Sequence, residues 1–298
     1  MLGALFDMTR KQTSKIRTGS RQYVLGRWLT RLLKYGVAVV ASLLILGPLY
    51  IAVVGGFKES GELINNPFAL PRAWILDNYH YILTLDAFWL QLRNSAIVML
   101  GTVFLATFSA SMASFVFARM RFKGRDALFN VFMIGLMFPI VVAILPLYIL
   151  MRQLSLINNL LGLILVEAAF QLSGMILIMR SFFRSIPLEL EDATYIDGGT
   201  PWTFFWRVLL PLSKPALAAN AALAMVFSWN LLFLPLLTLN DTALYTLPLG
   251  TMQFFGQYTA NWSRLMAFIV VAMLPAIVFY LIAERQIVEG LTGGSVKG

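Results

Sequence analysis

Six stretches of this chain are long, apolar and nearly free of charge, and they restrict the folds that it can adopt. A helix needs about 20 apolar residues to cross the hydrocarbon core of a bilayer. Each stretch is about that long, so the sequence predicts an all-α integral membrane protein with six transmembrane helices. The predicted spans cover about 35–57, 94–118, 127–151, 159–179, 216–239 and 264–283.

Composition excludes several classes of protein. The chain is 59% hydrophobic and only 12% charged, whereas a soluble domain carries about 25% charged residues. It has no cysteine and one histidine, His80, so disulfides, thiol chemistry, a cysteine or histidine metal site and a histidine-based triad are not expected. We therefore predict no catalytic, cofactor-binding or metal-binding residue on this chain.

The distribution of positive charge predicts how the spans are oriented. Most of the 23 Lys and Arg residues lie in the N-terminal tail, between the second and third spans, around residues 180–214, and at the C-terminal end. Short cytoplasmic loops carry such an excess of Lys and Arg. The sequence thus predicts a membrane protein with a cytoplasmic tail at 1–34, a membrane domain at 35–283 and a cytoplasmic tail at 284–298. The net charge of +9 is a topology signal rather than a sign of nucleic-acid binding.

Two ionisable or polar features inside the spans are candidates for function. Glu167 is the one acid within a predicted span. A buried acid is costly in a membrane and is a functional candidate, but it can equally pair with a Ser or Asn on a neighbouring helix. The stretch FSWNLLFLPLL in the fifth span combines an amide with aromatic rings, a surface that suits a sugar; an interhelical hydrogen bond from Asn230 is the alternative. The candidate substrate path comprises Ser228, Trp229, Asn230 and Phe233.

A polar segment between the fourth and fifth spans predicts a short helix with a defined end. Ser185 and Pro187 fit a helix start, because Pro is tolerated in the first turn. Gly198 and Gly199 fit its end, and Pro201 prevents it from resuming. The acids lie in its first two turns, where negative charge favours the helix dipole. They are Glu189, Glu191 and Asp192.

One face of this predicted helix is apolar, because its apolar residues recur at spacings of three and four. They are Ile186, Leu190, Ala193 and Ile196. A helix that lies on an anionic bilayer usually has basic flanks, and these flanks are acidic. Docking into a groove on a soluble protein is therefore the better interpretation.

The stretch EDATYIDGGTPWTFFWRVLLPLSKP, residues 191–215, resembles the EAA loop of permeases of binding-protein-dependent ABC importers. The pattern is Glu-Ala-Ala, three residues, Gly, nine residues, Ile, one residue, Leu-Pro. Aligned on Gly198, it begins at Asp192 and ends at Pro211. Asp stands in place of Glu and Thr in place of the second Ala, and Glu191 can alternatively supply the acid. The loop as a whole covers 185–215.

Other stretches are similar to the maltose-type sugar permeases, so the resemblance covers most of the chain. They are NSAIVMLGTVFLATFSASMASFVFARMRFKGRD, RSFFRSIPLELEDA, FSWNLLFLPLL, TLPLG and ERQIVEGLTGGSVKG. The resemblance implies the type I ABC importer permease fold in the bacterial inner membrane, with the helix at Glu189–Gly199 as a cytoplasmic coupling helix. It also implies four kinds of partner: a second homologous permease, two cytoplasmic ATPase subunits, an extracytoplasmic solute-binding protein and a saccharide solute.

The same resemblance assigns two groups of residues. Coupling to the ATPase falls on Glu189, Glu191, Asp192, Ala193, Ile196, Asp197, Gly198 and Pro211. Contact with the binding protein falls on an exterior loop, at Thr251, Gln253, Phe254, Phe255, Gln257 and Tyr258. From the residues alone, the aromatic side chains of that loop can serve either lipid headgroups or a partner.

The expected function is a non-catalytic permease subunit that imports a di- or oligosaccharide. The chain has no phosphate-binding loop of the form Gly-x-x-x-x-Gly-Lys-Ser/Thr, so ATP and Mg would be used by the partner ATPase. The alternatives are a non-sugar or acidic solute in the same importer class, or a stand-alone secondary transporter. A secondary transporter predicts ionisable residues in several spans and no docking helix, and an intramembrane enzyme predicts a His, Cys or paired-carboxylate cluster. The sequence has neither pattern.

Overall fold

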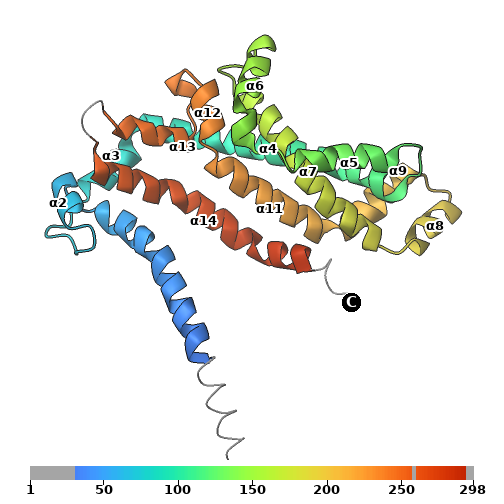
Figure 1. Ribbon diagram of the computed structural model, residues 1–298, viewed down its shortest axis with the longest axis horizontal. Coiled ribbons are helices and arrows are strands. Elements are labelled where there is room, and N and C mark those ends of the chain that lie inside the picture. The colour runs from blue at the N-terminus through green and yellow to red at the C-terminus, as the bar shows by residue number, and fades with distance from the viewer. Residues whose placement is uncertain (1–30, 257–259, 293–298) are drawn as a thin grey trace, which may run out of the picture.

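The computed structural model describes residues 31–256 and 260–292, and that part of the chain is helical without a β-strand. Four long helices run along the long axis of the molecule (Figure 1). They are α4 (Asp86–Arg119), α7 (Leu160–Ser185), α11 (Lys214–Asn230) and α14 (Trp262–Thr292). The most extensive packing joins α4 to α7, and α11 packs against both α4 and α14. The spans therefore form one bundle, as the many proline residues in them require.

The described helices include four that are long and apolar enough to cross a membrane. They are Arg31–Gly55, α4, α7 and the Trp262–Leu281 part of α14. Two helix pairs pass the same test together but are sharply bent. These are α5 (Arg125–Gly135) with α6 (Ile140–Gln153), at 101°, and Pro201–Leu212 with α11, at 74°. The described residues thus hold four candidate spans, or up to six if each bent pair crosses as one span; six is the predicted number.

Proline explains the break in the third predicted span and the bend that precedes the fifth. Between α5 and α6 the turns tighten, with the N–H of Phe138 donating to Gly135 O at 3.3 Å, and Pro139 then offers no donor. Before α11, Pro215 lies in the first turn and Ser213 is fully buried at the bend. Pro211 has no N–H to donate within its helix, Leu210–Leu212. A π-helical turn, Phe205–Leu209, directly precedes that helix. The fifth predicted span, 216–239, itself breaks after Asn230, and α12 (Phe233–Thr238) follows.

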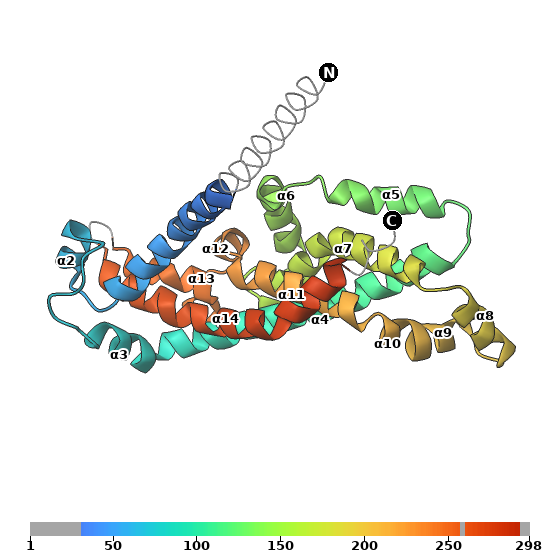
Figure 2. The same ribbon diagram turned by 90° about the horizontal axis from the view of Figure 1, so that it is seen from below.

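The remaining short elements lie at the two ends of the bundle and beside it (Figure 2). At one end lie α2 (Ser60–Asn65) and α3 (Asp77–Thr84). At the other, α8 (Glu189–Ile196) projects furthest, followed by α9 (Pro201–Phe204) and α10 (Leu210–Leu212). Between α12 and α14 lie three short helical turns: Thr242–Leu244, α13 (Leu247–Gly250) and Thr251–Phe254.

Small residues allow the central helices to approach closely. Ala106 and Ala110 of α4 are fully buried and belong to one cluster with Ala168 of α7. Such residues are enriched where helices pack within membranes. In contrast, the helix Arg31–Gly55 leaves the bundle at an angle (Figures 1 and 2), and its Leu44 side chain is 72% exposed. Its apolar surface thus faces lipid or a further subunit.

Candidate functional site

The helix α8 leaves the bundle through an extended turn after α7. Residue Ile186 has an extended backbone because the residue before a proline is disfavoured in the helical region. Ser185 therefore ends α7, and α8 begins at Glu189, two residues after Pro187. The predicted short helix is present, but its apolar face is smaller than predicted. Ile186 is only 8% exposed and packs with Phe183 at the end of α7.

Glycine ends α8 in the predicted position. Gly198 has a φ of +77°, a left-handed conformation that costs L-residues with a side chain about 1–2 kcal/mol. The N–H of Gly198 donates to Tyr195 O at 3.0 Å, and the N–H of Gly199 donates to Thr194 O at 2.8 Å. This pair of bonds is the Schellman motif, which satisfies the last carbonyls of the helix. The helix end is consequently sharp, and Thr200 caps α9 directly after it.

Most of the predicted coupling residues lie on the exposed surface of α8. None of the residues in the helix is buried, and Ile196 is 85% exposed. The other exposed members are Glu189, Asp192, Ala193, Asp197, Gly198 and Pro211, the last of them on α10. The exposed apolar residues Leu190, Ala193 and Ile196 recur every three residues along α8 and lie among carboxylates. The exception among the predicted residues is Glu191, which turns inward.

Glu191 joins α8 to the end of α4. Its Oε2 lies 3.4 Å from Nη1 of Arg119, and the two side chains are 13% and 3% exposed. Its Oε1 accepts a 2.8 Å hydrogen bond from the Tyr195 hydroxyl. Burial and this hydrogen bond raise the pKa of Tyr195 to about 12, so the hydroxyl remains a donor at neutral pH. Of the two candidate acids, Glu191 is therefore engaged within the chain, while Asp192 faces outward.

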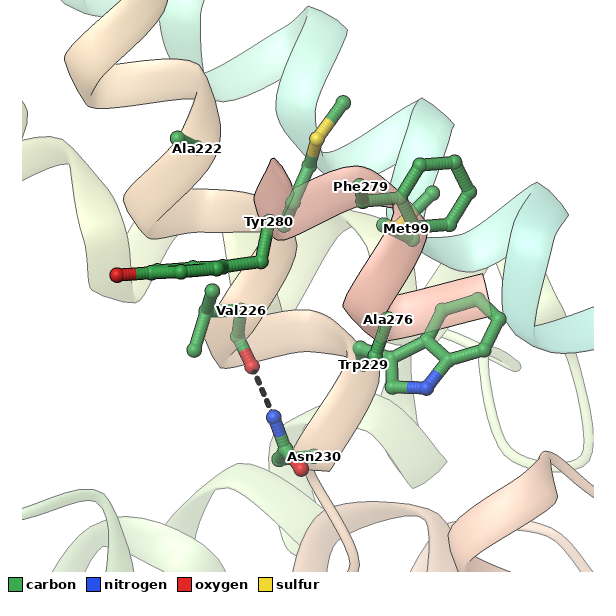
Figure 3. A pocket seen from close by; sticks show the side chains of 9 residues that line it. Met99, Ala222, Val226, Trp229, Asn230, Ala276, Phe279 and Tyr280 are labelled. Atoms are coloured by element: carbon green, nitrogen blue, oxygen red, sulfur yellow. Dashed lines mark hydrogen bonds between the residues drawn. The ribbon is translucent and has the colours of Figure 1, made fainter. Parts of the chain in front are cut away.

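A second candidate site lies where α11 ends against α14. A small cavity of about 40 Å³ is lined by Trp229 and Asn230 of α11, Met99 of α4, and Phe279 and Tyr280 of α14. Figure 3 shows the Asn230 side chain donating to Val226 O, at 2.7 Å. This bond lies within one helix, and within the described part of the chain Asn230 makes no interhelical hydrogen bond of the kind that was its alternative role. A larger cavity, of about 190 Å³, adjoins it and includes Thr251.

The four predicted path residues therefore separate into three places. Trp229 and Asn230 line both cavities. Ser228 faces the other way and donates a 2.5 Å hydrogen bond to Glu167 Oε2. Phe233 lies past the break, on α12. Successive residues of a helix are rotated by about 100° around its axis, so Ser228 points to another side of α11 than Trp229 does.

Glu167 is held between three helices. Its side chain is 1% exposed, and its Oε2 accepts hydrogen bonds from Thr102 of α4 at 3.2 Å and from Ser228 of α11. No basic side chain in the described residues forms an ion pair with it. The acid thus has the pairing role that the sequence left open, with a Ser and a Thr as its partners.

The predicted exterior contact loop is only partly exposed. Gln253 and Phe255 are exposed, whereas Phe254 packs against Phe268 with ring centroids 5.2 Å apart. Thr251 donates to Pro248 O at 2.6 Å. Gln257 and Tyr258 lie outside the described residues. The loop therefore offers Gln253 and Phe255 to a partner.

Comparison with known proteins identifies the family. Residues 106–291, more than half of the chain, match the family described as "binding-protein-dependent transport system inner membrane component". The chain belongs to this family. It is a permease of the carbohydrate ABC importer class, and permease subunits of this class are non-catalytic, multi-pass membrane proteins.

Several curated permeases are similar over most of their length. The permease is 34% identical to the arabinooligosaccharides transport system permease protein AraQ of Halalkalibacterium halodurans, with 91% of this chain and 97% of the relative covered. It is 30% identical to the diacetylchitobiose uptake system permease protein NgcG of Streptomyces coelicolor, with 89% and 88% covered. With the trehalose transport system permease protein SugB of Mycobacterium tuberculosis it shares 36% identity, over 77% and 84%.

A solved structure has the same fold as the permease. It is a crystal structure of a bacterial ABC transporter involved in the import of the acidic polysaccharide alginate. The TM-score is 0.76 at 21% identity, with 86% of this chain and 96% of that chain covered. The agreement confirms the all-helical permease architecture.

Three side chains complete the site at α8 and the cavity at the end of α11, although the sequence did not single them out. Arg119 was counted only among the basic residues that set the topology, and its burial depends on α7 and α8 lying beside it. Phe279 and Tyr280 belong to a span without polar residues nearby. A pair of adjacent aromatic residues in an apolar helix is an ordinary lipid-facing pattern, so no local signal separates them from packing residues.

Proposed function

We propose that this permease is one of two membrane subunits of an ATP-driven importer for a neutral di- or oligosaccharide. In this proposal α8 docks into a groove of one of two cytoplasmic ATPase subunits, which bind ATP and Mg, and a binding protein delivers the solute from outside. The family supports the importer class. The observation that carries the coupling role is α8 itself, a capped helix without a buried residue at one end of the bundle. Both termini would be cytoplasmic.

The surface of α8 supports a protein partner rather than lipid. An apolar surface with acids around it lacks the basic flanks of a membrane-surface helix, and helix-in-groove recognition uses such a surface. Ile196 is the most exposed of its apolar side chains. It is therefore the best candidate for the central contact.

Replacing Ile196 tests the docking proposal. We expect Ile196→Glu to weaken capture of the ATPase subunits about tenfold, which corresponds to about 1.4 kcal/mol, because a charge would enter the apolar contact. The measurement is the amount of ATPase that co-purifies with the tagged permease from cells that express the complete importer. Ile64→Glu on α2 is the matched control, since Ile64 is 63% exposed at the opposite end. Equal capture by both variants and the unchanged chain would contradict the proposal.

The cavity at the end of α11 supports a saccharide as solute. Its lining combines aromatic rings with one amide and has no charged side chain, and such a surface can stack on a sugar and donate to its hydroxyls. At about 40 Å³ it is much smaller than a ligand site of about 300–1,000 Å³. The second permease would therefore complete the site. Relatives named for arabinooligosaccharides, diacetylchitobiose and trehalose support this solute class.

Replacing Tyr280 tests whether the cavity at the end of α11 lies on the solute path. We expect Tyr280→Ala to reduce solute uptake about tenfold, a loss of about 1.4 kcal/mol, because it removes the aromatic ring against which a sugar would pack. Tyr280→Phe should retain most of the uptake, because the ring remains. The measurement is uptake of labelled oligosaccharide by the reconstituted importer. Leu281→Ala is the control, since Leu281 is the next residue and is 64% exposed. A loss of uptake in Leu281→Ala as large as that in Tyr280→Ala would remove the assignment.

A further inference from the structure

Arg119 is the point where four segments of the chain meet. It is the last residue of α4, and its side chain is 3% exposed. Its Nη2 donates to Phe183 O and to Ile186 O, both at 2.6 Å, and its Nη1 donates to Glu191 Oε2 at 3.4 Å. The guanidinium carbon also lies 5.7 Å from the centre of the Phe204 ring on α9. One side chain thus contacts the end of α7, the turn that follows, α8 and α9.

Only an arginine suits these acceptors. The carbonyls of Phe183 and Ile186 lie where α7 ends, and the last carbonyls of a helix have no partner within it. A guanidinium presents several N–H groups in a rigid planar fork, whereas lysine presents one compact ammonium. Arg119 therefore satisfies two carbonyls with one nitrogen and holds a carboxylate with the other.

Few other contacts hold α8 to the bundle. None of its residues is buried, so apolar burial contributes little to fixing its orientation. The link between Glu191 and Arg119 is its one ion pair in the described chain, and Tyr195 holds the second oxygen of the same carboxylate. Any displacement of α8 by a partner therefore acts on Arg119.

Arg119 connects α8 to the interior sites through one unbroken helix, α4. The helix α4 has 34 residues and is thus about 50 Å long at 1.5 Å per residue. On the way it carries Thr102, which binds Glu167, and Met99, which lines the cavity at the end of α11. A shift of its Arg119 end would therefore move groups at both interior sites.

We propose that Arg119 is a positioning residue that transmits the movement of α8 into α4, with Glu191 as its dedicated acid. Asp192 is then the acid that faces the ATPase. The inference rests on the proposed docking of α8 and adds how that docking reaches the spans. It predicts that loss of the Arg119–Glu191 link separates ATP hydrolysis from transport and leaves the assembly intact.

The test uses the complete importer in proteoliposomes, with the binding protein and an oligosaccharide that it binds. The variants are Arg119→Lys, Glu191→Gln and Asp192→Asn, with Arg121→Lys as the control because Arg121 is exposed on the same side. Three quantities are measured: the ATPase that co-purifies, the rate of ATP hydrolysis, and the solute taken up per ATP. We expect Arg119→Lys and Glu191→Gln to retain the first two within about twofold and to lose at least tenfold in uptake per ATP. Asp192→Asn should lower the ATPase that co-purifies.

Each outcome has one meaning. If Arg119→Lys and Glu191→Gln keep the uptake per ATP of the unchanged importer, the transmission role is wrong even though α8 docks. If the unchanged permease captures no ATPase, the proposed function fails instead. If Arg119→Lys gives a poor yield, Glu191→Gln decides, because Glu191 lies on α8, which has no buried residue, and Gln keeps the size of the side chain. A merely structural role would lower yield, hydrolysis and uptake together in Glu191→Gln, and that result would also overturn the proposal.

Discussion

Gly198→Val is expected to abolish solute uptake while the permease still reaches the membrane. Gly198 has a φ of +77°, a region that is strongly unfavourable for a β-branched residue. A Cβ at this position would meet no atom within 4 Å, so the penalty comes from the backbone alone. Valine would therefore move the chain out of the left-handed region and break the two hydrogen bonds that end α8. The cost, about 1–2 kcal/mol or more, is local and does not threaten the bundle.

Gly198→Asn tests whether position 198 requires the left-handed backbone or only the absence of a side chain. Asn tolerates the left-handed region better than other residues, so Gly198→Asn should keep most of the uptake. Gly61→Val is the control, because Gly61 on α2 also has open space around it and has no positive φ. The measurements are uptake by the reconstituted importer and the amount of ATPase captured. Equal uptake for the Val and Asn variants would show that α8 does not require this conformation.

Glu167→Ala is expected to lower the free energy of unfolding of the permease by about 2–4 kcal/mol. Two interhelical hydrogen bonds are lost, each contributing about 0.6–1.7 kcal/mol in a membrane protein, and a cavity is left among three packed helices. Glu167→Gln keeps the volume and one acceptor oxygen, so its cost should stay below about 1 kcal/mol. The hydroxyls of Thr102 and Ser228 would then still have a common partner.

The measurement is unfolding of the purified permease in mixed micelles as denaturing detergent increases. Leu165→Ala is the matched control on the same helix, because Leu165 is 40% exposed on the outside of the bundle. It removes a side chain of similar size without a buried cavity or a hydrogen bond. A loss in Leu165→Ala as large as that in Glu167→Ala would mean that Glu167 does not hold the helices together.

Two predicted spans, 127–151 and 216–239, are each divided between two helices. The helical character of the apolar stretches and the end of α8 at the glycine pair were predicted correctly. Both depend on short-range chemistry: the length of an apolar run, and a residue that can adopt a positive φ. The same rules placed Ile186 on α8, which was wrong. The spacing of three and four residues included Ile186, but Ile186 lies outside the helix. The proline that follows it favours an extended backbone.

Other features could not be read from spacing. Pro139 accounts for a break between α5 and α6, but the 101° bend depends on how the two helices pack against the bundle. Asn230 and Ser228 are two residues apart in one polar motif, and only the neighbouring helices separate their roles. The cavity beside Asn230 also requires Tyr280 from another helix, and no local pattern marks that residue.

By itself, the sequence determined that the chain is an apolar helical bundle with a short, glycine-ended helix exposed at one end. Run length and backbone preference act within a few residues, so they can be read in order along the chain. Only the tertiary structure decided which of the two adjacent acids turns inward. Glu191 and Asp192 are chemically alike and lie about 100° apart on the helix. Their roles differ because Arg119, distant in sequence, lies beneath one of them.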